Sequence, residues 1–527
     1  MLPFSGTKNR TALLKRRWLS LLVGFALLFG MGIIPGSVWA KDIKVLRIGI
    51  GIDPDTLLPT EITTAIPYNI AKLIYGALAK YTDDGEMVPN LATAWSFSPD
   101  GKTFTVQLRK GVKFTDGSDF NAHSHKNYLE LIMNPKVRVP LRFLFGPVVS
   151  VDIVDDYTVR YNLKNAYAPL EQMLAVSSAM SLKATTPWDA DKLRKHHVGA
   201  GPYKLTEWVR GERIVLERNE NYWGERPTVD KIIYMIIPES ATRVAMLRAG
   251  QLDVAYSPSP PDIKSLEASP DFKVARPLST RMIFMGMNTQ KGYTKDKRIR
   301  QALNYAVDKQ AICDRILFGV AKPLDAPVPP SLFGYSKMPN QYDYNPDKAR
   351  ALLKEAGFPE GGEIKMITPN GRYTYDKQIA ETIQAYLQEV GVKTTLRTYD
   401  WPTYMGMTTR PLDKTELELY LIGWGAPYYD ADFMTFMYFS SYVQPPRGLG
   451  STFYSNPEFD KTTYMARSIV DKDKRKALYQ KATQMLWDDA PAIWLHVEPF
   501  SVAFASKYQG IRVLPHEMCF PQYMTVK

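Results

Sequence analysis

Histidines are the residues of this chain whose type and spacing could bind a metal ion. His123 and His125 are two residues apart, whereas His196 and His197 are adjacent. Metal-binding histidines on one face of a helix are three or four residues apart, and those on a strand are two apart. Only the first pair fits a strand spacing, and no third ligand lies nearby in the sequence. We therefore predict structural or surface roles for these histidines and no metal site.

Motifs that would carry enzymatic chemistry are absent from the sequence. It contains neither a His-Glu-x-x-His zinc motif nor a Gly-x-Ser-x-Gly nucleophile turn. Gly101-Lys102-Thr103 resembles the end of a phosphate loop, but Ser96 stands where that loop requires glycine. The paired carboxylates Asp83-Asp84 and Asp488-Asp489 are typical of turns and helix ends. The sequence thus favours a protein that is not an enzyme and that needs no cofactor.

The first forty residues are typical of a secretory signal. Lys8, Arg10 and residues 15–17 are basic, an apolar run follows over residues 18–34, and Val38-Trp39-Ala40 comes next. A basic start, an apolar centre and small residues before the cut are the features of such a signal. The apolar run is shorter than the roughly 20 residues that a membrane span needs. We predict cleavage after Ala40 and export across the inner membrane, with a retained N-terminal anchor as the alternative.

Length and composition restrict the remaining classes. A chain of 527 residues is too long to fold around a single hydrophobic core. Its length predicts two or three domains of about 100–200 residues each. The 66 basic and 54 acidic residues are interleaved, whereas a nucleic-acid-binding protein concentrates positive charge on one face or arm. We therefore expect no nucleic-acid partner. The two cysteines, Cys313 and Cys519, could pair in an oxidising compartment, and the sequence leaves that question open.

The elements that would position a site are mixed strands and helices. Apolar and polar residues alternate along strands, whereas apolar residues on one helix face recur every three or four positions. Strands are predicted over 102–109, 158–163, 203–208, 213–218, 231–237, 392–398 and 417–423. Helices are predicted over 240–249, 297–318, 346–356, 376–390 and 472–488. The pattern indicates an α/β chain with antiparallel hairpins in its first half and helix–strand alternation in its second.

Two long segments carry a resemblance to a known family. They read LATAWSFSPDGKTFTVQLRKGVKFTDG over residues 91–117 and GAGPYKLTEWVRGERIVLERNENYWG over residues 199–224. The chain resembles the family 5 extracellular solute-binding proteins, the periplasmic dipeptide, oligopeptide and nickel-chelate receptors of ABC importers. The resemblance implies a two-lobed periplasmic-binding-protein fold of type II, in its large three-domain variant, with a hinge between the lobes.

The resemblance also implies how the chain is divided. After the signal peptide over 1–40, lobe I is expected to comprise residues 41–75, 191–283 and 491–527. An extra domain II is expected over 76–190 and lobe III over 284–490. Two chain crossings, near 282–288 and near 493–498, are expected to form the hinge, around which closure traps a solute.

Several ligand-binding residues follow from the same resemblance. Arg372 resembles the family arginine that holds a ligand carboxylate, a task that suits the planar guanidinium fork. Trp424 resembles the tryptophan that lines the cleft. Asp430 and Asp432 could each accept a ligand ammonium, and Asp430 could instead brace its loop. Further residues expected to face the cleft are Asp53, Thr56, Asn288, Trp401 and Tyr404.

One departure from the family pattern concerns the ligand amine. Peptide receptors of the family carry an aspartate three residues after the cleft tryptophan, and this chain has Pro427 there. Proline offers neither charge nor N–H, which puts a plain dipeptide or oligopeptide in doubt. We expect a monomer that captures a peptide-like or organic carboxylate solute in the periplasm. It would deliver that solute to the permease and ATPase subunits of an ABC importer. The alternative is a secreted hydrolase or a peptide-binding chaperone that uses the same cleft.

Overall fold

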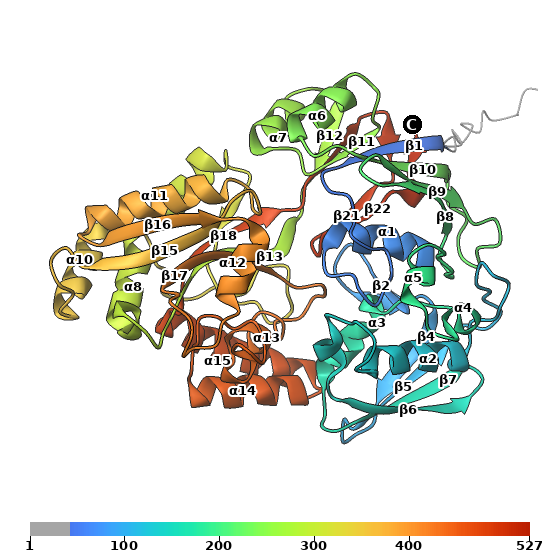
Figure 1. Cartoon of the computed structure of the whole chain (residues 1–527), viewed down its shortest axis with the longest axis horizontal. Helices are drawn as coiled ribbons and strands as arrows, with labels where there is room; N and C mark the ends of the chain where they lie inside the picture. The colour runs from blue at the N-terminus through green and yellow to red at the C-terminus, as the bar shows by residue number, and fades with distance from the viewer. Residues whose placement is uncertain (1–42) are drawn as a thin grey trace, which may run out of the picture. The chain divides into compact units, whose positions relative to one another are not determined.

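Residues 43–527 are described by a computed structural model of the chain (Figure 1). The predicted leader and its cleavage after Ala40 lie outside the described residues. Within 43–527, no helix combines the length and the apolar character that a membrane crossing requires. Both cysteines of the chain are buried and free, so the structure contains no Cys313–Cys519 bond.

A seven-stranded sheet gathers strands from distant parts of the sequence. Its core strand β1 pairs in parallel with β10 and β11, and β8, β9 and β10 form an antiparallel meander. The predicted hairpin is confirmed, because Gly211 turns the chain between β8 and β9 with a φ of 73°. In spatial order the strands are β12 (Phe272–Ala275), β19 (Val502–Ala505), β11 (Val254–Tyr256), β1 (Ile43–Ile50), β10 (Val229–Ile236), β9 (Arg213–Arg218) and β8 (Tyr203–Val209).

A six-stranded sheet is built from the second half of the chain. β15 pairs in parallel with β16 and β17, and β13 pairs antiparallel with β17 and β18. The strands run in the order β14 (Lys322–Pro323), β18 (Ala492–Pro499), β13 (Leu278–Met287), β17 (Leu419–Gly425), β15 (Glu363–Pro369) and β16 (Lys393–Tyr399). Helix α11 (Asp376–Glu389) packs on β15 and β16. This is the helix–strand alternation that the sequence predicted.

A four-stranded antiparallel sheet forms a third body. Its order is β4 (Ala92–Phe97), β5 (Thr103–Leu108), β7 (Thr158–Leu163) and β6 (Val148–Asp155). Helix α2 (Ala122–Met133) packs on β6 and starts with a capping box between Asn121 and Ser124. Three two-stranded ribbons complete the sheets of the described chain: β2 (Ala79–Tyr81) with β3 (Met87–Pro89), β20 (Tyr508–Gln509) with β23 (Thr525–Val526), and β21 (Arg512–Leu514) with β22 (Met518–Phe520).

The chain changes between the two larger sheets at two adjacent points. It leaves β12 and enters β13 through residues 276–277, and it leaves β18 and enters β19 through residues 500–501. The Phe500 N–H donates to the Pro277 carbonyl at 2.9 Å, which ties the two crossings together. The crossings predicted over 282–288 and 493–498 are therefore displaced, because those residues pair within the six-stranded sheet. The domain boundaries themselves stay a prediction.

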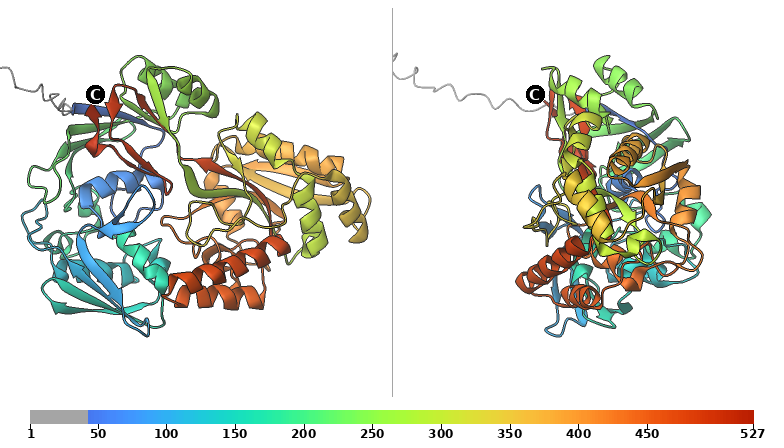
Figure 2. Two further views of the ribbon diagram at one scale, coloured as in Figure 1. Left: turned by 180° about the vertical axis from the view of Figure 1, so that it is seen from behind. Right: turned by 90° about the vertical axis from the view of Figure 1, so that its left-hand side faces the viewer.

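The helices follow their local sequence signals, with one exception. The predicted helix over 297–318 is interrupted, because α8 (Lys297–Ala306) ends and Asp308 caps a new start at α9 (Lys309–Ala311). Figure 2 shows the long C-terminal pair α14 and α15 side by side. The other α-helices of eight or more residues are α1 (Ala65–Tyr75), α6 (Ser240–Arg248), α7 (Pro260–Glu267), α10 (Pro346–Glu355), α12 (Trp401–Thr408), α14 (Pro457–Ser468) and α15 (Lys472–Asp489).

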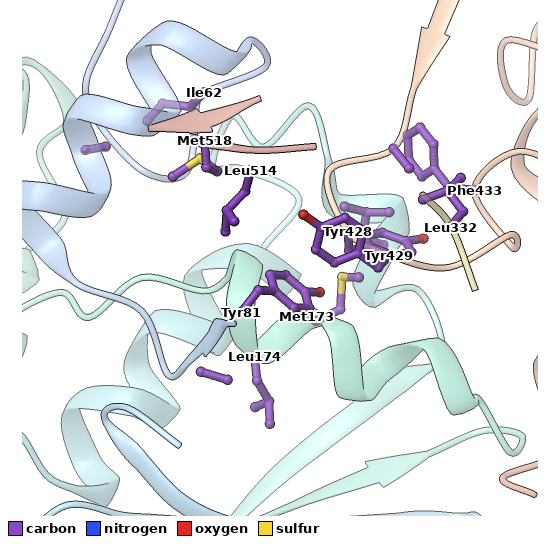
Figure 3. Close-up of a cluster of buried hydrophobic side chains, with 14 of the residues drawn as sticks. Ile62, Tyr81, Met173, Leu174, Leu332, Tyr428, Tyr429, Phe433, Leu514 and Met518 are labelled. Carbon is purple, nitrogen blue, oxygen red and sulfur yellow. The ribbon is translucent and has the colours of Figure 1, made fainter. Parts of the chain in front are cut away.

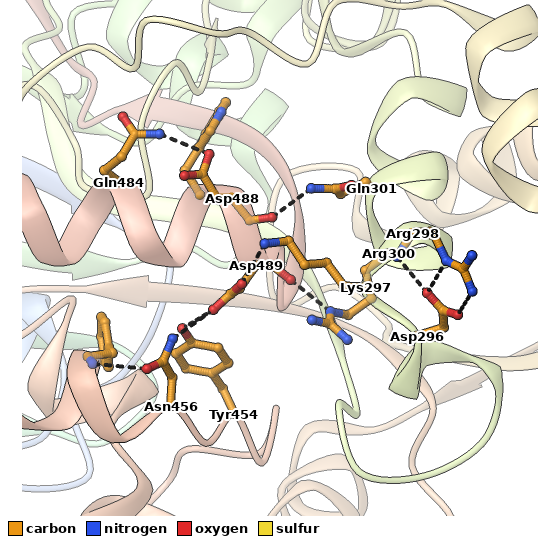
Figure 4. A network of polar contacts seen from close by, with 12 residues as sticks. Asp296, Lys297, Arg298, Arg300, Gln301, Tyr454, Asn456, Gln484, Asp488 and Asp489 are labelled. Atoms are coloured by element: carbon orange, nitrogen blue, oxygen red, sulfur yellow. Dashed lines mark hydrogen bonds and ion pairs between the residues drawn. The ribbon is translucent and has the colours of Figure 1, made fainter. Parts of the chain in front are cut away.

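A polar network fastens the end of α15 to the start of α8 (Figure 4). Asp489 accepts hydrogen bonds from Tyr454 at 2.6 Å and Asn456 at 3.0 Å, and it pairs with Lys297 at 2.9 Å. Burial alone would raise the pKa of Asp489, yet Lys297 and these hydrogen bonds hold the pKa below its ordinary value. The carboxylate therefore keeps its charge and fixes one end of the six-stranded sheet's helical cover.

Apolar side chains join the three bodies (Figure 3). Tyr81 of β2 meets Tyr429 edge to face, with ring centroids 4.6 Å apart. Tyr429 follows β17 of the six-stranded sheet, whereas Met173 and Leu174 of the same cluster belong to α3 (Met173–Val176). Such aromatic pairs add about 0.5–1.5 kcal/mol to the energy of area burial. The cluster packs beside the segments 425–427 and 516–517.

Candidate functional site

A cavity of about 120 Å³ lies where the two chain crossings meet the ends of several elements. We call it the cleft cavity. Its wall combines the chain before and at the start of α1, the start of β13, the loop after β15, the end of β17 and the turn between β21 and β22. The residues that line it are Ile62, Thr63, Thr64, Ala65, Tyr68, Leu141, Val176, Thr280, Arg281, Arg372, Gly425, Ala426, Pro427, His516 and Glu517.

The loop that carries Arg372 is shaped by a buried carboxylate. Gly371 takes a φ of 77°, a conformation that suits glycine because it lacks a Cβ. Asp376 at the start of α11 then accepts backbone N–H groups from Gly371 at 3.0 Å, Arg372 at 2.8 Å and Tyr373 at 3.1 Å. These three hydrogen bonds fix the loop between β15 and α11 as a turn that places Arg372 in the wall of the cavity.

The Arg372 guanidinium lies against two aromatic rings. It lies 5.1 Å from the Tyr373 ring centroid and 5.0 Å from that of Trp401, within cation–π range. Among residues 43–527 no carboxylate pairs with it, and its side chain is half-buried. Burial first, and the neighbouring Arg281 next, lower the pKa of Arg372, although an arginine stays charged at any pH a protein experiences. The result is a positive group with spare donors at the cavity wall.

A second arginine in the same wall is neutralised. Arg281 of β13 pairs with Glu517 at 2.8 Å, and both side chains are largely buried. Burial would lower the pKa of Arg281, but the Glu517 carboxylate outweighs it and raises that pKa. Glu517 has a φ of 61°, and Asn69 fixes its backbone by donating to the Glu517 carbonyl at 2.7 Å. A strained conformation held in this way is typical of functional sites.

Sequence reasoning missed Arg281, Glu517, Thr280 and His516. The one signal for Arg281 is its place directly before residues 282–288, where a chain crossing between lobes was predicted. Glu517 has no local signal, because its partner lies 236 residues away in sequence. Pro427 was noted for its missing charge, and the structure places it in the wall of the cleft cavity.

Trp424 lies on β17, one residue before the cavity-lining segment 425–427. Its ring stacks on Phe433 with centroids 4.8 Å apart, and its Nε1 donates to the Phe433 carbonyl at 2.7 Å. Trp401 and Tyr404 stack on each other at 5.8 Å next to Arg372. Tyr404 is fully buried and donates to the Leu421 carbonyl. These rings form the packing that supports the Arg372 loop and the end of β17.

Asp430 and Asp432 are both engaged in buried ion pairs. Asp430 pairs with Arg475 of α15 at 2.6 Å, and Asp432 pairs with Arg467 of α14 at 3.1 Å. Neither aspartate lines the cleft cavity. Burial is the largest influence on Asp432 and raises its pKa to about 6. The arrangement favours the bracing role that the sequence left open for Asp430.

The three remaining predicted residues hold turns together. Asn288 is fully buried and donates to the Leu417 carbonyl at 3.0 Å. Asp53 accepts from Trp208 Nε1 at 3.0 Å and from the Gly211 N–H at 2.8 Å, which docks its loop on the β8–β9 hairpin. The Thr56 hydroxyl accepts from the Leu58 N–H at 3.0 Å. None of the three lines the cleft cavity, and their role in binding stays a prediction.

No group of three or more metal-ligating side chains is present within residues 43–527. His125, one of the candidate metal ligands, is buried and its Nε2 lies 2.6 Å from the Tyr161 hydroxyl. His123 is exposed on the same helix, α2. The two side chains therefore lie in different environments and share no ligand position.

The burial of His125 makes the protein sensitive to acid. Burial lowers the pKa of His125 to about 3, whereas an unfolded histidine titrates near 6.5. Between these values the unfolded chain binds the additional proton, so stability falls as pH falls below 6.5. We expect this residue alone to cost about 1.5 kcal/mol of unfolding free energy between pH 6.5 and pH 5.

Denaturant unfolding of the wild type and of His125→Gln at both pH values measures this contribution. Between pH 6.5 and pH 5, the unfolding free energy of His125→Gln should fall by about 1.5 kcal/mol less than that of the wild type. His123→Gln is the matched control from the same helix and should keep the wild-type dependence. An unchanged pH dependence in His125→Gln would show that His125 does not contribute.

Comparison with known proteins decides the family. The model of the bacterial extracellular solute-binding proteins, family 5, matches residues 86–445. The chain belongs to this family. The glutathione-binding protein GsiB of Pectobacterium atrosepticum is 31% identical over 95% of this chain and 96% of its own length. The family 5 assignment confirms the resemblance seen in the two signature segments.

Solved structures of periplasmic binding proteins match 92% of this chain. The periplasmic binding protein DppA of Helicobacter pylori, solved in complex with the peptide STSA, is 27% identical. It matches with a TM-score of 0.80 over 92% of this chain and 98% of its own. HbpA2 of Haemophilus parasuis matches with a TM-score of 0.81 at 26% identity over 92% of this chain and 100% of its own. The predicted two-lobed α/β fold is thereby confirmed.

Proposed function

We propose that the cleft cavity binds a small peptide-like solute, or another organic carboxylate, through Arg372. The observation that carries the proposal is a guanidinium that faces a cavity and has no acidic partner among residues 43–527. A cation removed from water without a counter-charge is unfavourable. A ligand carboxylate would supply that charge and accept two parallel hydrogen bonds from the fork.

The relatives support a ligand of this chemistry. The relative from Pectobacterium atrosepticum is named a glutathione-binding protein, and the DppA structure holds the peptide STSA. Both of those ligands end in a carboxylate. The cleft cavity of this chain therefore offers the group that such ligands require.

The wall also contains a candidate for the ligand ammonium. Pro427 replaces the aspartate expected there and contributes no charge. Glu517 is the one acid in the cavity wall of the described chain, and its carboxylate is bound to Arg281 through one oxygen. We infer that Glu517 takes over part of the missing aspartate's role. Its pairing with Arg281 would make the anchor weaker than a free carboxylate.

The proposal includes a place and a set of partners. Removal of residues 1–40 would release the protein into the periplasm, where it would act as a monomer. The lobes would close on the solute, and the closed form would be recognised by the permease and ATPase subunits of an ABC importer. The solute would be bound and released without chemical change.

A ligand screen tests the proposal. We expect the purified protein to gain several degrees of melting temperature with glutathione, with short peptides or with small organic acids, because ligands that bind only the folded state stabilise it. The carboxamide forms of the same compounds are the matched controls and should give no comparable shift. Mass spectrometry should recover the bound compound intact. Absence of any shift across the panel would contradict the proposal, and turnover of the compound would favour a hydrolase.

A further inference from the structure

A second cavity adjoins the cleft cavity. It measures about 190 Å³, lies between α1, the β2–β3 ribbon and the segments 222–225 and 512–523, and is here called the side chamber. Tyr68, Pro427 and His516 line both cavities, so the two meet at these three residues. Ligand sites in proteins begin near 300 Å³. Neither cavity alone reaches that size, whereas the two together do.

The junction between the cavities carries no charge at neutral pH. His516 is held by the Tyr429 hydroxyl, 2.8 Å from its Nδ1. Burial, and then the nearby Lys72, lower the pKa of His516 to about 3, so the imidazole is neutral. Tyr68 donates its hydroxyl to the Val176 carbonyl at 2.9 Å. An uncharged, mostly aromatic passage suits the apolar middle of a solute whose polar groups lie at its ends.

Two of the cations that line the side chamber are already engaged. The Lys72 ammonium donates to the carbonyls of Val176 and Ser177, both at 2.7 Å. Arg512 pairs with Asp83 at 2.7 Å and donates to the Tyr81 carbonyl. An additional anion would have to displace these contacts, so neither group is free to bind a ligand carboxylate.

Arg109 differs from these cations. Its Nε donates to the Asn90 carbonyl at 2.8 Å, and its guanidinium lies 4.8 Å from the Trp223 ring centroid. No carboxylate within residues 43–527 pairs with it, and the side chain is half-buried. Arg109 therefore resembles Arg372: each guanidinium lies beside an aromatic ring and pairs with no acid of the described residues.

Gln522 supplies an independent sign of a missing partner. Its side chain is only 6% exposed, it lines the side chamber, and in the described chain its Oε1 has no hydrogen-bond donor. A buried acceptor without a donor destabilises the folded protein. An N–H or O–H group of a bound molecule would satisfy it. Within residues 43–527, the wall of the side chamber therefore combines an arginine that pairs with no acid and a buried hydrogen-bond acceptor that has no donor, although one acid, Glu225, also lines the chamber.

We propose that the side chamber receives a second carboxylate of the solute, held by Arg109, with an amide or amine N–H of the same molecule donated to Gln522. The inference rests on the proposed function, because Arg372 holds the first carboxylate. The two guanidinium groups then select peptide-like solutes with a carboxylate at each end over those with one. A neutral or singly charged end would leave Arg109 without a counter-charge.

Isothermal titration with glutathione and its two monoamides tests this, each monoamide having one carboxyl group converted to a carboxamide. We expect both monoamides to bind the wild type about 10- to 100-fold more weakly than glutathione does. Arg109→Gln should weaken glutathione by a similar factor, yet change one monoamide less than about twofold, because the carboxylate that Arg109 would bind is already gone. Arg372→Gln should behave in the same way toward the other monoamide.

Control variants separate charge from packing. Lys110→Gln removes the adjacent cation, which lies outside the side chamber, and should bind all three compounds as the wild type does. Arg109→Lys keeps the charge and should retain part of the preference for glutathione even if it packs less well on Trp223. The melting temperature of each variant reports its folding.

Two results would overturn the inference. If Arg109→Gln binds all three compounds as the wild type does while Arg372→Gln weakens them, the side chamber is not used and the proposed function stands. If the wild type binds neither glutathione nor its monoamides but does bind peptides with a single carboxylate, the two-carboxylate class is wrong and the cleft cavity remains the site. If both arginine variants bind all three compounds as the wild type does, the result would instead contradict the proposed function itself.

Discussion

Replacing Arg372 by alanine is expected to weaken carboxylate binding by about 2–5 kcal/mol, the usual effect of removing one partner of a buried charge pair. The guanidinium lies over two rings and pairs with no acid in the described part of the chain, so its donors remain available to a ligand. Isothermal titration with the compound identified in the ligand screen measures the effect. The fold should be retained, because the Arg372 backbone is fixed by Asp376 and not by its own side chain.

Two further variants make the test specific. Arg397→Ala removes an exposed arginine of β16 in the same six-stranded sheet and should leave the dissociation constant within about twofold. Arg372→Lys keeps the positive charge but loses the planar fork, so it should recover only part of the affinity. A dissociation constant that Arg372→Ala leaves unchanged would remove Arg372 from the site.

Replacing Asp430 by asparagine is expected to lower the free energy of unfolding by about 3–5 kcal/mol. The substitution keeps the shape of the side chain but leaves Arg475 buried without its counter-charge, which is the unfavourable case for buried pairs. The pair is 2.6 Å long, and its side chains are 2% and 5% exposed. Chemical denaturation of the wild type and the variant measures the difference.

A pair of the same length at the surface is the matched control. Glu458 and Lys481 also lie 2.6 Å apart, but their side chains are more than half exposed. Glu458→Gln should leave the free energy of unfolding close to the wild-type value, because water screens exposed pairs. Equal losses in the two variants would contradict the bracing role of Asp430. An Asp430→Asn variant that keeps its stability but loses ligand affinity would show that Asp430 binds the ligand.

The fold was predictable wherever local pattern decides structure. The hairpin over residues 203–218 and the helix 376–389 follow from alternation, apolar spacing and turn glycines. The helix predicted over 297–318 was wrong in one respect, because Asp308 caps a new start and breaks it. The two crossings were predicted at positions that lie inside β13 and β18. The sequence could not place them correctly, because only the pairing of the strands shows where one sheet ends and the other begins.

The candidate site was predictable only in part. The Arg372 loop carries its own signal, a strand, a glycine and a helix start within a few residues. Asp430 and Asp432 have a charge of the right sign to bind a ligand amine. In the tertiary structure, however, Asp430 pairs with Arg475 and Asp432 pairs with Arg467. Which charge pairs with which depends on helices 35 and 45 residues further along the chain.

By itself, the sequence determined the class of protein, the alternation of strands and helices and the loop that presents Arg372. These depend on interactions between residues close together in the chain or on long segments shared with a family. Only the tertiary structure decided that Arg281 meets Glu517 and that Asp430 and Asp432 each pair with an arginine. It also decided that Arg109 and Arg372 pair with no acid of the described residues 43–527. The physical reason is that the free energy of a charge depends on its burial and its nearest partner, and folding sets both.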